Sequence, residues 1–589
     1  MELSNQIKIE PELLATESVN HEVEGKRGSS FSIRKLDKLE KKVGRNYETL
    51  FARAAIYFNN KEFKRSRFYF EKAYEINKNT ELIHCLLKVC KKLNILEEAR
   101  KYFNKVPDVL EKNPVFWQLA GYVELDLENP SVAADKFLKA RSLGFPDENL
   151  NLEFLSKSLN NANRMQEILE LLGPEINAGN KNFIVFECYL SALLNFKDYA
   201  AVHKLLMERT ENDWQNSGRI NAYEAVCQYQ LFHDHDKCYS FNKKAHELSP
   251  ETVQIRWNLA LASLRIGKIR EGIGYYKDRF EWKEFPSPRR VFEVPIWNEN
   301  ICKEKKIMIW SEQGIGDELL FVNAISEFQK VFPNLIFETH PKTIETMERS
   351  FPDLENRIAI FNKPELTPII KDYDYHIPLG DVFLWFIKNN LDKLEKNKCI
   401  NSKPYVIPDK LRKEYWRLKL PNNGKPNVGF CWTSKNVEGE RQRYHSSIES
   451  WKKLLERTDV NFISLQYNYD FDDLQNEIGN LAKNFVDTGF LDQMDDLDGA
   501  FSLISNLDLI ITSPSAPYIM GPICGVETWY YGAPAPFMLG RTGKFIDHPI
   551  QANLKHYTTE NASGDQELVN HFNKKLDEYT TKFNSTKNR

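Results

Sequence analysis

The sequence predicts an α-solenoid followed by an α/β domain with two parallel-sheet lobes. Residues 46–285 carry the apolar spacing of amphipathic helices, with almost no alternation of the β type. From residue 303 onward, apolar runs of strand length alternate with helical stretches, which is typical of parallel sheets built from βαβ units. Between the two regions, Pro286, Pro288 and Pro295 interrupt the helical pattern and mark a domain boundary.

Six parts are expected along the chain. The first 45 residues are polar and weakly periodic, and they are interpreted as a disordered or loosely helical leader. The other parts are the helix pairs (46–285), a docking linker (286–302), an N-terminal Rossmann-like lobe (303–405), a C-terminal Rossmann-like lobe (406–564), and a terminal helix with its tail (565–589).

The helices repeat with a period of about 34 residues, which is the tetratricopeptide length. An alanine of the second helix recurs as Ala73, Ala140 and Ala245, with separations of 67 and 105 residues, close to two and three periods. About seven helix pairs are expected, of which the fourth and fifth, near residues 149–210, are degenerate. Such pairs stack into a curved superhelix whose concave groove binds a partner. The clearest unit contains Trp117, Gly121, Ala133, Phe137, Ala140 and Pro146.

The bulk composition excludes several classes of protein. A net charge of -3 and a pI near 6.5 give no general attraction for nucleic acid or an anionic membrane. The nine cysteines form no CxxC pair, so we expect reduced thiols, with no disulfide framework and no metal site. No window approaches the roughly 18 uninterrupted apolar residues of a membrane span, and no secretory signal is recognisable. The expected location is the cytoplasm.

Three turns that follow predicted strands are the candidate sites, because ligands of open parallel sheets bind at the carboxyl ends of strands. The first turn contains Gln313, Gly314 and Gly316 and ends at Asp317, where a helix begins. Its glycines let the backbone approach a phosphate, and the helix offers free N–H groups. An ionised Asp317 can also take a proton from an attacking hydroxyl. The alternative is a carboxylate that only caps its own helix.

The second turn follows the expected strand 428–432. It carries hydroxyls and cations, which suit a pyrophosphate because its charges need donors and counter-ions. The alternative is a solvated loop whose charges bind nothing. The candidate donor-binding residues of this turn are Thr433, Ser434, Lys435 and Arg443.

The third turn follows the expected strand 507–512. Its Ser513 and Ser515 can donate hydrogen bonds to a phosphate. Upstream, the acidic residues between Asp492 and Asp498 are interpreted as solvated. The run from His233 to Asp236 is interpreted as an exposed turn between repeat helices rather than a metal site.

Seven blocks of sequence, in this order and at sensible spacing, resemble a known family. Together they look like bacterial tetratricopeptide proteins whose C-terminal domain is similar to the heptosyltransferases, glycosyltransferase family 9. The resemblance covers about residues 46–540, and the third block is its most specific part. The blocks are Phe280-Glu-Trp282, Pro295-Ile-Trp297, Trp310-Ser-Glu-Gln-Gly-Ile-Gly-Asp317, Tyr373-Asp-Tyr-His-Ile-Pro-Leu379, Val428-Gly-Phe-Cys-Trp432, Ser464-Leu-Gln466 and Leu507-Asp-Leu-Ile-Ile511.

The resemblance implies the GT-B arrangement of two Rossmann-like lobes with a nucleotide-sugar in the cleft. It implies inversion at the anomeric carbon without a cofactor or an essential metal. Asp317 corresponds to the family's general base, and Thr433 and Ser434, with Lys435 or Arg443, correspond to its donor-phosphate contacts.

The third turn departs from the family pattern. Ser513-Pro-Ser515 stands where the family has Asp-Thr-Ser, and Tyr518 replaces a histidine that contacts the donor. Two functions therefore stay open. The chain is either a glycosyltransferase whose protein or glycan acceptor is recruited by the repeat groove, or a non-catalytic scaffold with a degenerate transferase-like domain.

Overall fold

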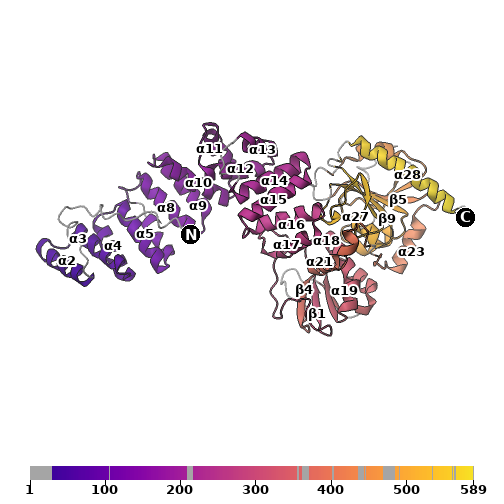
Figure 1. Ribbon diagram of the computed structural model, residues 1–589, viewed down its shortest axis with the longest axis horizontal. Helices are drawn as coiled ribbons and strands as arrows, with labels where there is room; N and C mark the ends of the chain where they lie inside the picture. Colours follow the sequence, from indigo (N-terminus) through magenta and orange to yellow (C-terminus); the bar gives the residue numbers. More distant parts are fainter. Residues whose placement is uncertain are drawn as a thin grey trace. The chain divides into compact units, whose positions relative to one another are not determined.

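The structure is a computed structural model. In it the chain forms two compact units, Met1–Trp214 and Gln215–Arg589. Figure 1 shows helices over the first unit and a mixed α/β region at the end of the second. The structure describes residues 29–104, 107–208, 216–354, 357–360, 370–400, 403–434, 444, 446–467, 485–489, 491–533, 535–559, 562 and 565–587.

The first unit is built from successive helix pairs. Asparagine side chains begin several of these helices by accepting N–H groups of the first turn, as Asn79 does for Leu82 and Asn113 does for Val115. The helices are α2 (Ser29–Val43), α3 (Tyr47–Asn59), α4 (Phe63–Ile76), α5 (Thr80–Leu93), α6 (Leu96–Ala99), α7 (Lys101–Asn104), α8 (Pro114–Asp126), α9 (Pro130–Ser142), α10 (Glu148–Asn161), α11 (Met165–Asn177), α12 (Phe183–Asn195) and α13 (Tyr199–Glu208).

Helix α2 lies inside the segment interpreted as a leader. Its Leu36 is buried, and its Asp37 and Glu40 both pair with Arg53 of α3. The second half of the leader is therefore a helix that packs on the first repeat. For residues 29–43 this agrees with the loosely helical form of the interpretation.

The second unit begins with two more pairs, α14 (Gly218–Phe232) with α15 (His235–Leu248), and α16 (Val253–Arg265) with α17 (Ile269–Tyr276). A short 3-10 helix, η4 (Lys277–Glu281), follows. Counted over the described residues, the helices α3 to α17 form seven pairs if the short helices α6 and α7 are taken together as one member, and these include the two pairs whose sequences are degenerate. Small residues allow close packing, since a Cβ on Gly121 would overlap the Phe137 ring.

The first lobe contains a four-stranded parallel sheet in the order β3-β2-β1-β4. Its strands are β1 (Ile307–Trp310), β2 (Leu335–Thr339), β3 (Ile358–Ile360) and β4 (Tyr375–Pro378). The helices are α18 (Ile315–Phe321), α19 (Ile325–Val331), α20 (Ile344–Ser350), α21 (Leu379–Asn389) and α22 (Leu391–Leu394). The sequence predicts these strands at residues 306–310, 335–339, 358–361 and 373–377, and each observed strand agrees within two residues at each end.

The second lobe contains a seven-stranded sheet in the order β10-β11-β9-β8-β5-β6-β7, parallel except for β10. Strands β7, β9, β10 and β11 were not predicted. The strands are β5 (Asn427–Cys431), β6 (Asn461–Ser464), β7 (Phe485–Val486), β8 (Leu509–Thr512), β9 (Glu527–Gly532), β10 (Phe545–Asp547) and β11 (Leu554–Thr558). The helices are α23 (Lys410–Lys419), α24 (Lys452–Leu455), α26 (Leu497–Ile504), α27 (Pro517–Ile523) and α28 (Gln566–Lys587).

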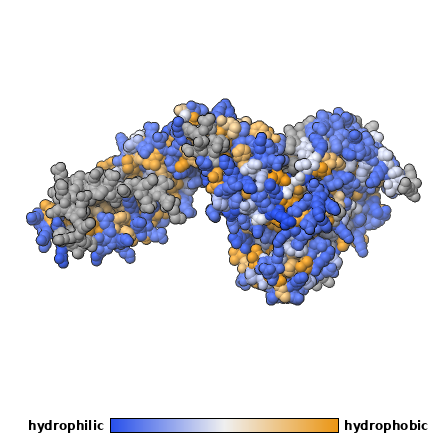
Figure 2. Space-filling view, in the orientation of Figure 1, coloured by the Kyte–Doolittle hydropathy of each residue, from blue (hydrophilic) through white to orange (hydrophobic). Residues whose placement is uncertain are grey.

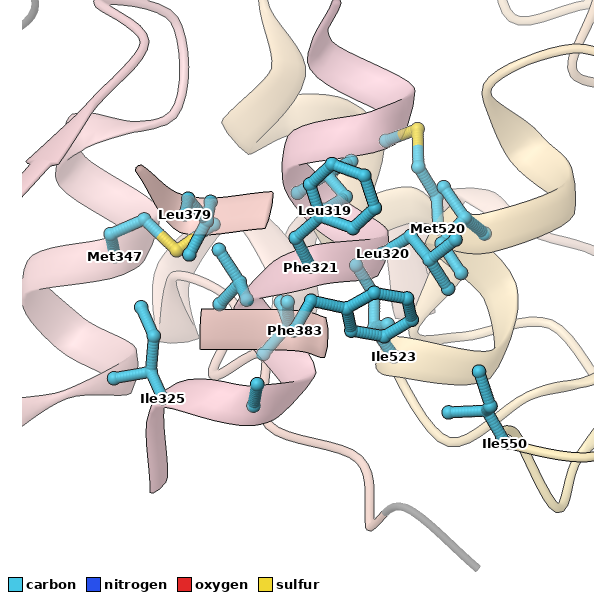
Figure 3. Packing of buried hydrophobic residues seen from close by; sticks show 14 of the residues in the cluster. Leu319, Leu320, Phe321, Ile325, Met347, Leu379, Phe383, Met520, Ile523 and Ile550 are labelled. Carbon is cyan, nitrogen blue, oxygen red and sulfur yellow. The ribbon is translucent and has the colours of Figure 1, made fainter. Parts of the chain in front are cut away.

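One hydrophobic core joins the last helix pair to both lobes. It contains Leu264 of α16, Phe321 of α18 and Ile523 of α27, all fully buried. Figure 3 shows Leu319, Leu320 and Phe321 of α18 beside Met520 and Ile523 of α27. The predicted fold class, helix pairs followed by two parallel-sheet lobes, is confirmed.

Hydrophilic residues predominate on the face of the molecule in Figure 2, with apolar residues in scattered patches. Among the helices of the described residues, none combines the length and apolar character needed to cross a bilayer.

Candidate functional site

The three candidate turns lie where the order of strands in each sheet changes side, so that successive strands are added on opposite sides of a starting strand. In the first sheet, β2 and β3 are added on one side of β1 and β4 on the other, so the 311–317 turn follows the strand at the reversal. In the second sheet, β6 and β7 lie on one side of β5, while β8 and β9 lie on the other. The turns after β5 and β8 flank that reversal. Such switch points are where open α/β sheets bind ligands.

The first turn has an unusual backbone. Gln313 has φ of 62°, in the left-handed region that side chains disfavour. Gly314 is the N-cap of α18, and Asp317 lies in the first helical turn. A Cβ on Gly314 would lie 3.8 Å from Asp317 Oδ2, so the carboxylate lies over the glycine. The N-cap residue Gly314 has no side chain to cap the helix, and Asp317 lies in the first helical turn beside it. Whether Asp317 acts as a base or only stabilises its helix stays a prediction.

A buried ion pair holds the start of this turn. Glu312 accepts hydrogen bonds from Arg279 Nε at 2.8 Å and Nη2 at 2.6 Å, and from the Gly380 N–H at 2.6 Å. Both charged side chains are fully buried. Arg279 also pairs with Asp381 at 2.7 Å. Burial alone lowers the pKa of Arg279, but the charges of Glu312 and Asp381 outweigh it and raise that pKa.

A second buried carboxylate lies at the end of the turn. Glu318 accepts hydrogen bonds from Ser311 Oγ, from Thr339 Oγ1 at 2.7 Å and from Thr343 Oγ1 at 3.0 Å, as well as from the His340 N–H. Burial raises the pKa of Glu318, and these hydrogen bonds oppose the rise. The turn from Ser311 to Asp317 is thus held near its start by the buried Glu312 and just after its end by the buried Glu318.

Two residues from outside the lobe contact Gln313. Its side-chain amide donates to Tyr276 Oη at 3.1 Å, and its backbone N–H donates to Ser287 Oγ. Burial raises the pKa of Tyr276; Arg279 lowers it, while the nearby charges of Glu312 and Asp317 raise it further. Tyr276 therefore stays a neutral phenol next to the turn.

The second turn is organised by Gln466, which follows β6. Its Oε1 accepts the N–H groups of Trp432 and Thr433 at 3.2 and 3.1 Å, and Tyr467 Oη donates to Ser434 Oγ at 3.3 Å. Thr433 is half-buried and Ser434 is buried. The other two candidates of this turn, Lys435 and Arg443, lie outside the described residues.

The third turn keeps its serine hydroxyls inside the protein. Ser513 is fully buried, and Ser515 Oγ lies 3.2 Å from Cys431 Sγ and 3.1 Å from Thr512 Oγ1. Burial raises the pKa of Cys431 to about 11, so this thiol is neutral. Donation from these two hydroxyls to a phosphate stays a prediction. In this arrangement each hydroxyl would first have to give up its hydrogen bond within the protein.

Tyr518 is half-buried at the start of α27. Its ring lies 5.0 Å from that of Tyr530, which stacks on His556 at 4.7 Å. The residue in place of the family's histidine is therefore held by an aromatic column, and a donor contact from it stays a prediction.

The second and third turns are joined directly, and the first and third turns are related through the helices that follow them. The Ser513 N–H donates to Cys431 O at 2.8 Å, which joins the second and third turns. The helices that follow the first and third turns, α18 and α27, pack against each other. Residues of both lobes thus gather around these turns.

The interpretation of the 492–498 acids as solvated is wrong for two of them. Asp496 pairs with Arg412 of α23, and Asp498, only 8% exposed, pairs with Arg349 of α20 and accepts from Thr346 Oγ1 at 2.7 Å. These acids begin α26, where they meet arginines from other segments. The Asp498 contacts connect the two lobes, because Arg349 and Thr346 belong to the first lobe, whereas Asp496 and Arg412 both belong to the second.

Sequence reasoning missed Glu312, Glu318 and Arg279. Glu312 lies inside the most specific sequence block, so that block carried a signal for it. Arg279 had none, because a charged residue after a repeat helix is usually solvated. In the 233–236 run, Asp234 begins α15 by accepting the Lys237 N–H. Within the described residues, no group of three or more His, Cys, Asp or Glu side chains is arranged to hold a metal ion.

Comparisons with known proteins give the following likenesses. No protein-family model matches the chain. Protein FlbA of Caulobacter vibrioides is 26% identical over 412 residues, which is 66% of this chain and 67% of that protein. The E. coli ADP-heptose lps heptosyltransferase II aligns at 14% identity and a TM-score of 0.32, over 46% of this chain and 99% of its own. A tetratricopeptide repeat protein from Parabacteroides merdae aligns at 14% identity and a TM-score of 0.25, over 40% and 95%.

The similar structures thus include the two classes that the sequence resembles. Because their TM-scores are low, the fold is defined here by the chain's own helix pairs and parallel sheets.

Proposed function

We propose that the chain is an inverting glycosyltransferase that moves a sugar from a nucleotide-sugar to an acceptor hydroxyl. The observation that carries this proposal is the placement of the three candidate turns. All three lie at the switch points of two parallel sheets, and the helices after the first and third turns pack together. A bilobal site of this kind suits a donor with a sugar and a diphosphate.

In the proposed reaction, Asp317 accepts the proton of the acceptor hydroxyl. The acceptor oxygen then forms a bond to the anomeric carbon, while the bond from that carbon to the diphosphate oxygen breaks. The nucleoside diphosphate leaves with the electron pair of the broken bond, and this single displacement inverts the configuration of the anomeric carbon. A carboxylate in the first turn of a helix is favoured in its ionised form, as a base requires.

The donor is assigned to the second lobe. Thr433 and Ser434 supply hydroxyls for the diphosphate, and Lys435 and Arg443 supply the counter-charge. No metal or other cofactor is invoked in this proposal. The acceptor, a protein or a glycan, is assigned to the repeat groove, and nucleic acid is not expected as a partner. The cytoplasm is the proposed location, since all nine cysteines are free thiols.

One observation favours the second candidate, a binding scaffold without turnover. The hydroxyls of Ser513 and Ser515 bond within the protein, and Tyr518 is held against Tyr530. In that case the repeats bind a partner, and the α/β domain keeps its fold without binding a donor.

Thermal stabilisation by a panel of nucleotide-sugars separates the two candidates. The panel contains ADP-, GDP-, UDP- and CMP-linked sugars and the free nucleotides. A ligand at 100 times its dissociation constant adds about 2.7 kcal/mol to the free energy of unfolding. We expect at least one nucleotide-sugar to raise the melting temperature. If no ligand of the panel raises the melting temperature, the proposal of an enzyme is contradicted and the binding scaffold remains.

A further inference from the structure

We propose that the last helix pair of the solenoid positions the base-bearing turn, with Tyr276 and Arg279 as the positioning residues. This inference rests on the proposed function, in which Asp317 is the base. The helix pair is α16 and α17, and Arg279 lies in η4 directly after it. The base-bearing turn is the segment 311–317.

The first contact fixes Glu312. Arg279 binds this carboxylate through two hydrogen bonds, at 2.6 and 2.8 Å, and both side chains are fully buried. A two-bond guanidinium–carboxylate pair fixes direction as well as distance. Gly380 completes the contact, because its N–H donates to Glu312 and a Cβ there would overlap the carboxylate. The carboxylate therefore has one available orientation.

The second contact fixes the next residue. Gln313 donates its side-chain amide to Tyr276 Oη at 3.1 Å, and Ser287 accepts its backbone N–H. Gln313 is held in the left-handed region, with φ of 62°. Residues in this region persist where their surroundings determine them. Without Tyr276, Gln313 loses the partner that holds its side chain.

These contacts reach Asp317 through a short path. Asp317 follows Gln313 by four residues, and its carboxylate lies over Gly314. A rotation of the backbone at Gln313 therefore moves the N-terminus of α18 and with it the carboxylate. A base must lie within hydrogen-bond reach of the proton it takes, so a small displacement reduces its rate.

The second lobe meets the same tyrosine. The ring of Phe537 lies 5.7 Å from that of Tyr276, 6.0 Å from that of Phe321 and 5.2 Å from that of Phe383. The repeat, the helix after the base-bearing turn and the second lobe thus share one aromatic junction. The last repeat is a part of the catalytic domain as well as the end of the solenoid.

The first test is hydrogen exchange of backbone amides in the full-length chain. Tyr276→Phe removes only the hydroxyl that Gln313 contacts. Tyr275→Phe, a neighbouring half-buried tyrosine whose ring packs on His246, is the matched control. We expect the amides of residues 311–318 to exchange at least tenfold faster in Tyr276→Phe and unchanged in the control. Exchange at the wild-type rate in Tyr276→Phe overturns the inference.

The second test measures turnover with water as acceptor, using the nucleotide-sugar that gives the largest thermal shift. We expect Tyr276→Phe to lower kcat about tenfold while KM and donor affinity change less than twofold. Arg279→Lys keeps the charge but loses the two-bond geometry, and we expect it to retain more activity than Arg279→Met. An unchanged kcat in Tyr276→Phe contradicts positioning even if the wild type is an active transferase. If the wild type transfers no sugar, the proposed function fails, and the exchange measurement still decides whether the repeat orders the turn.

Discussion

Arg279 and Glu312, which are 33 residues apart, form a fully buried ion pair with two hydrogen bonds of 2.6 and 2.8 Å. Arg279 comes from the end of the helical repeats, and Glu312 begins the turn that carries Asp317. Burying both charges is unfavourable unless each is well paired, and removing one partner of such a pair costs about 3–5 kcal/mol. The last helix pair and the first lobe are therefore expected to unfold together.

Gly380→Ala tests the packing around this ion pair. The new Cβ would overlap Glu312 Oε1 and lie 2.9 Å from Arg279 Nη2, so we expect the free energy of unfolding to fall by about 1–3 kcal/mol. Gly274→Ala is the control, because a Cβ there meets nothing within 4 Å and the residue is in a helix. It should raise stability by about 0.5–1 kcal/mol. Urea unfolding measures both, and equal effects would mean that Gly380 is not tightly packed.

Gly540→Ala tests the contact between the last repeat and the second lobe. Gly540 has φ of +78°, and a Cβ there would lie 2.5 Å from Gly267 Cα. We expect two costs, about 1–2 kcal/mol for the left-handed backbone and about 1–3 kcal/mol for the overlap. Gly424→Ala has φ of +86° and open space, so it carries only the first cost. If the two variants lose equal stability in urea, the last repeat is not tightly packed against the loop that contains Gly540.

Buried histidines predict a loss of stability in mild acid. Burial lowers the pKa of His548 to about 3 and that of His556 to about 4, below the value near 6.5 of an unfolded chain. Below about pH 6.5 the unfolded state binds more protons, so stability is full above that pH and falls as pH decreases toward these pKa values. Each histidine should cost about 2 kcal/mol between pH 7 and pH 5.

His556→Phe tests this pH dependence, because it removes the titration and keeps a ring beside Tyr530. The difference in urea midpoint between pH 7 and pH 5 should be smaller in the variant than in the wild type. Between pH 8 and pH 7, where unfolded histidine is mostly neutral, the two proteins should change alike. An equal acid loss in both proteins would show that His556 is not the origin.

The sequence predicted the four strands of the first sheet and β5, β6 and β8 of the second, but it missed β7, β9, β10 and β11. Strands β2 and β8 are buried along their length and begin with three consecutive apolar residues, which stand out from their surroundings. Strand β10 has three residues, and in β11 the polar residues Lys555 and His556 are adjacent and interrupt the alternation typical of a strand, so neither has a strong signal. Their pairing, antiparallel at β10 and parallel to β9, depends on contacts that local pattern does not contain.

The site shows the same division between local and distant information. The base-bearing turn was found because two glycines and an acid follow a buried strand. Tyr276 and Arg279 were not found, because they lie 37 and 33 residues before their partners and their neighbours predict only a repeat helix. The direction of the Ser513 and Ser515 hydroxyls was also not predicted, because the sequence of a turn does not show which of its side chains point into the protein.

The central claim is that Asp317 is the base of a glycosyl transfer. The direct measurement is the rate of sugar transfer by Asp317→Asn at saturating nucleotide-sugar, together with the donor dissociation constant. Glu345→Gln is the matched control, an exposed carboxylate in the first turn of α20 in the same lobe. We expect Asp317→Asn to lose at least 100-fold in kcat, the lower range of general-base catalysis, with donor affinity within twofold and Glu345→Gln unchanged. Wild-type turnover in Asp317→Asn would contradict the account.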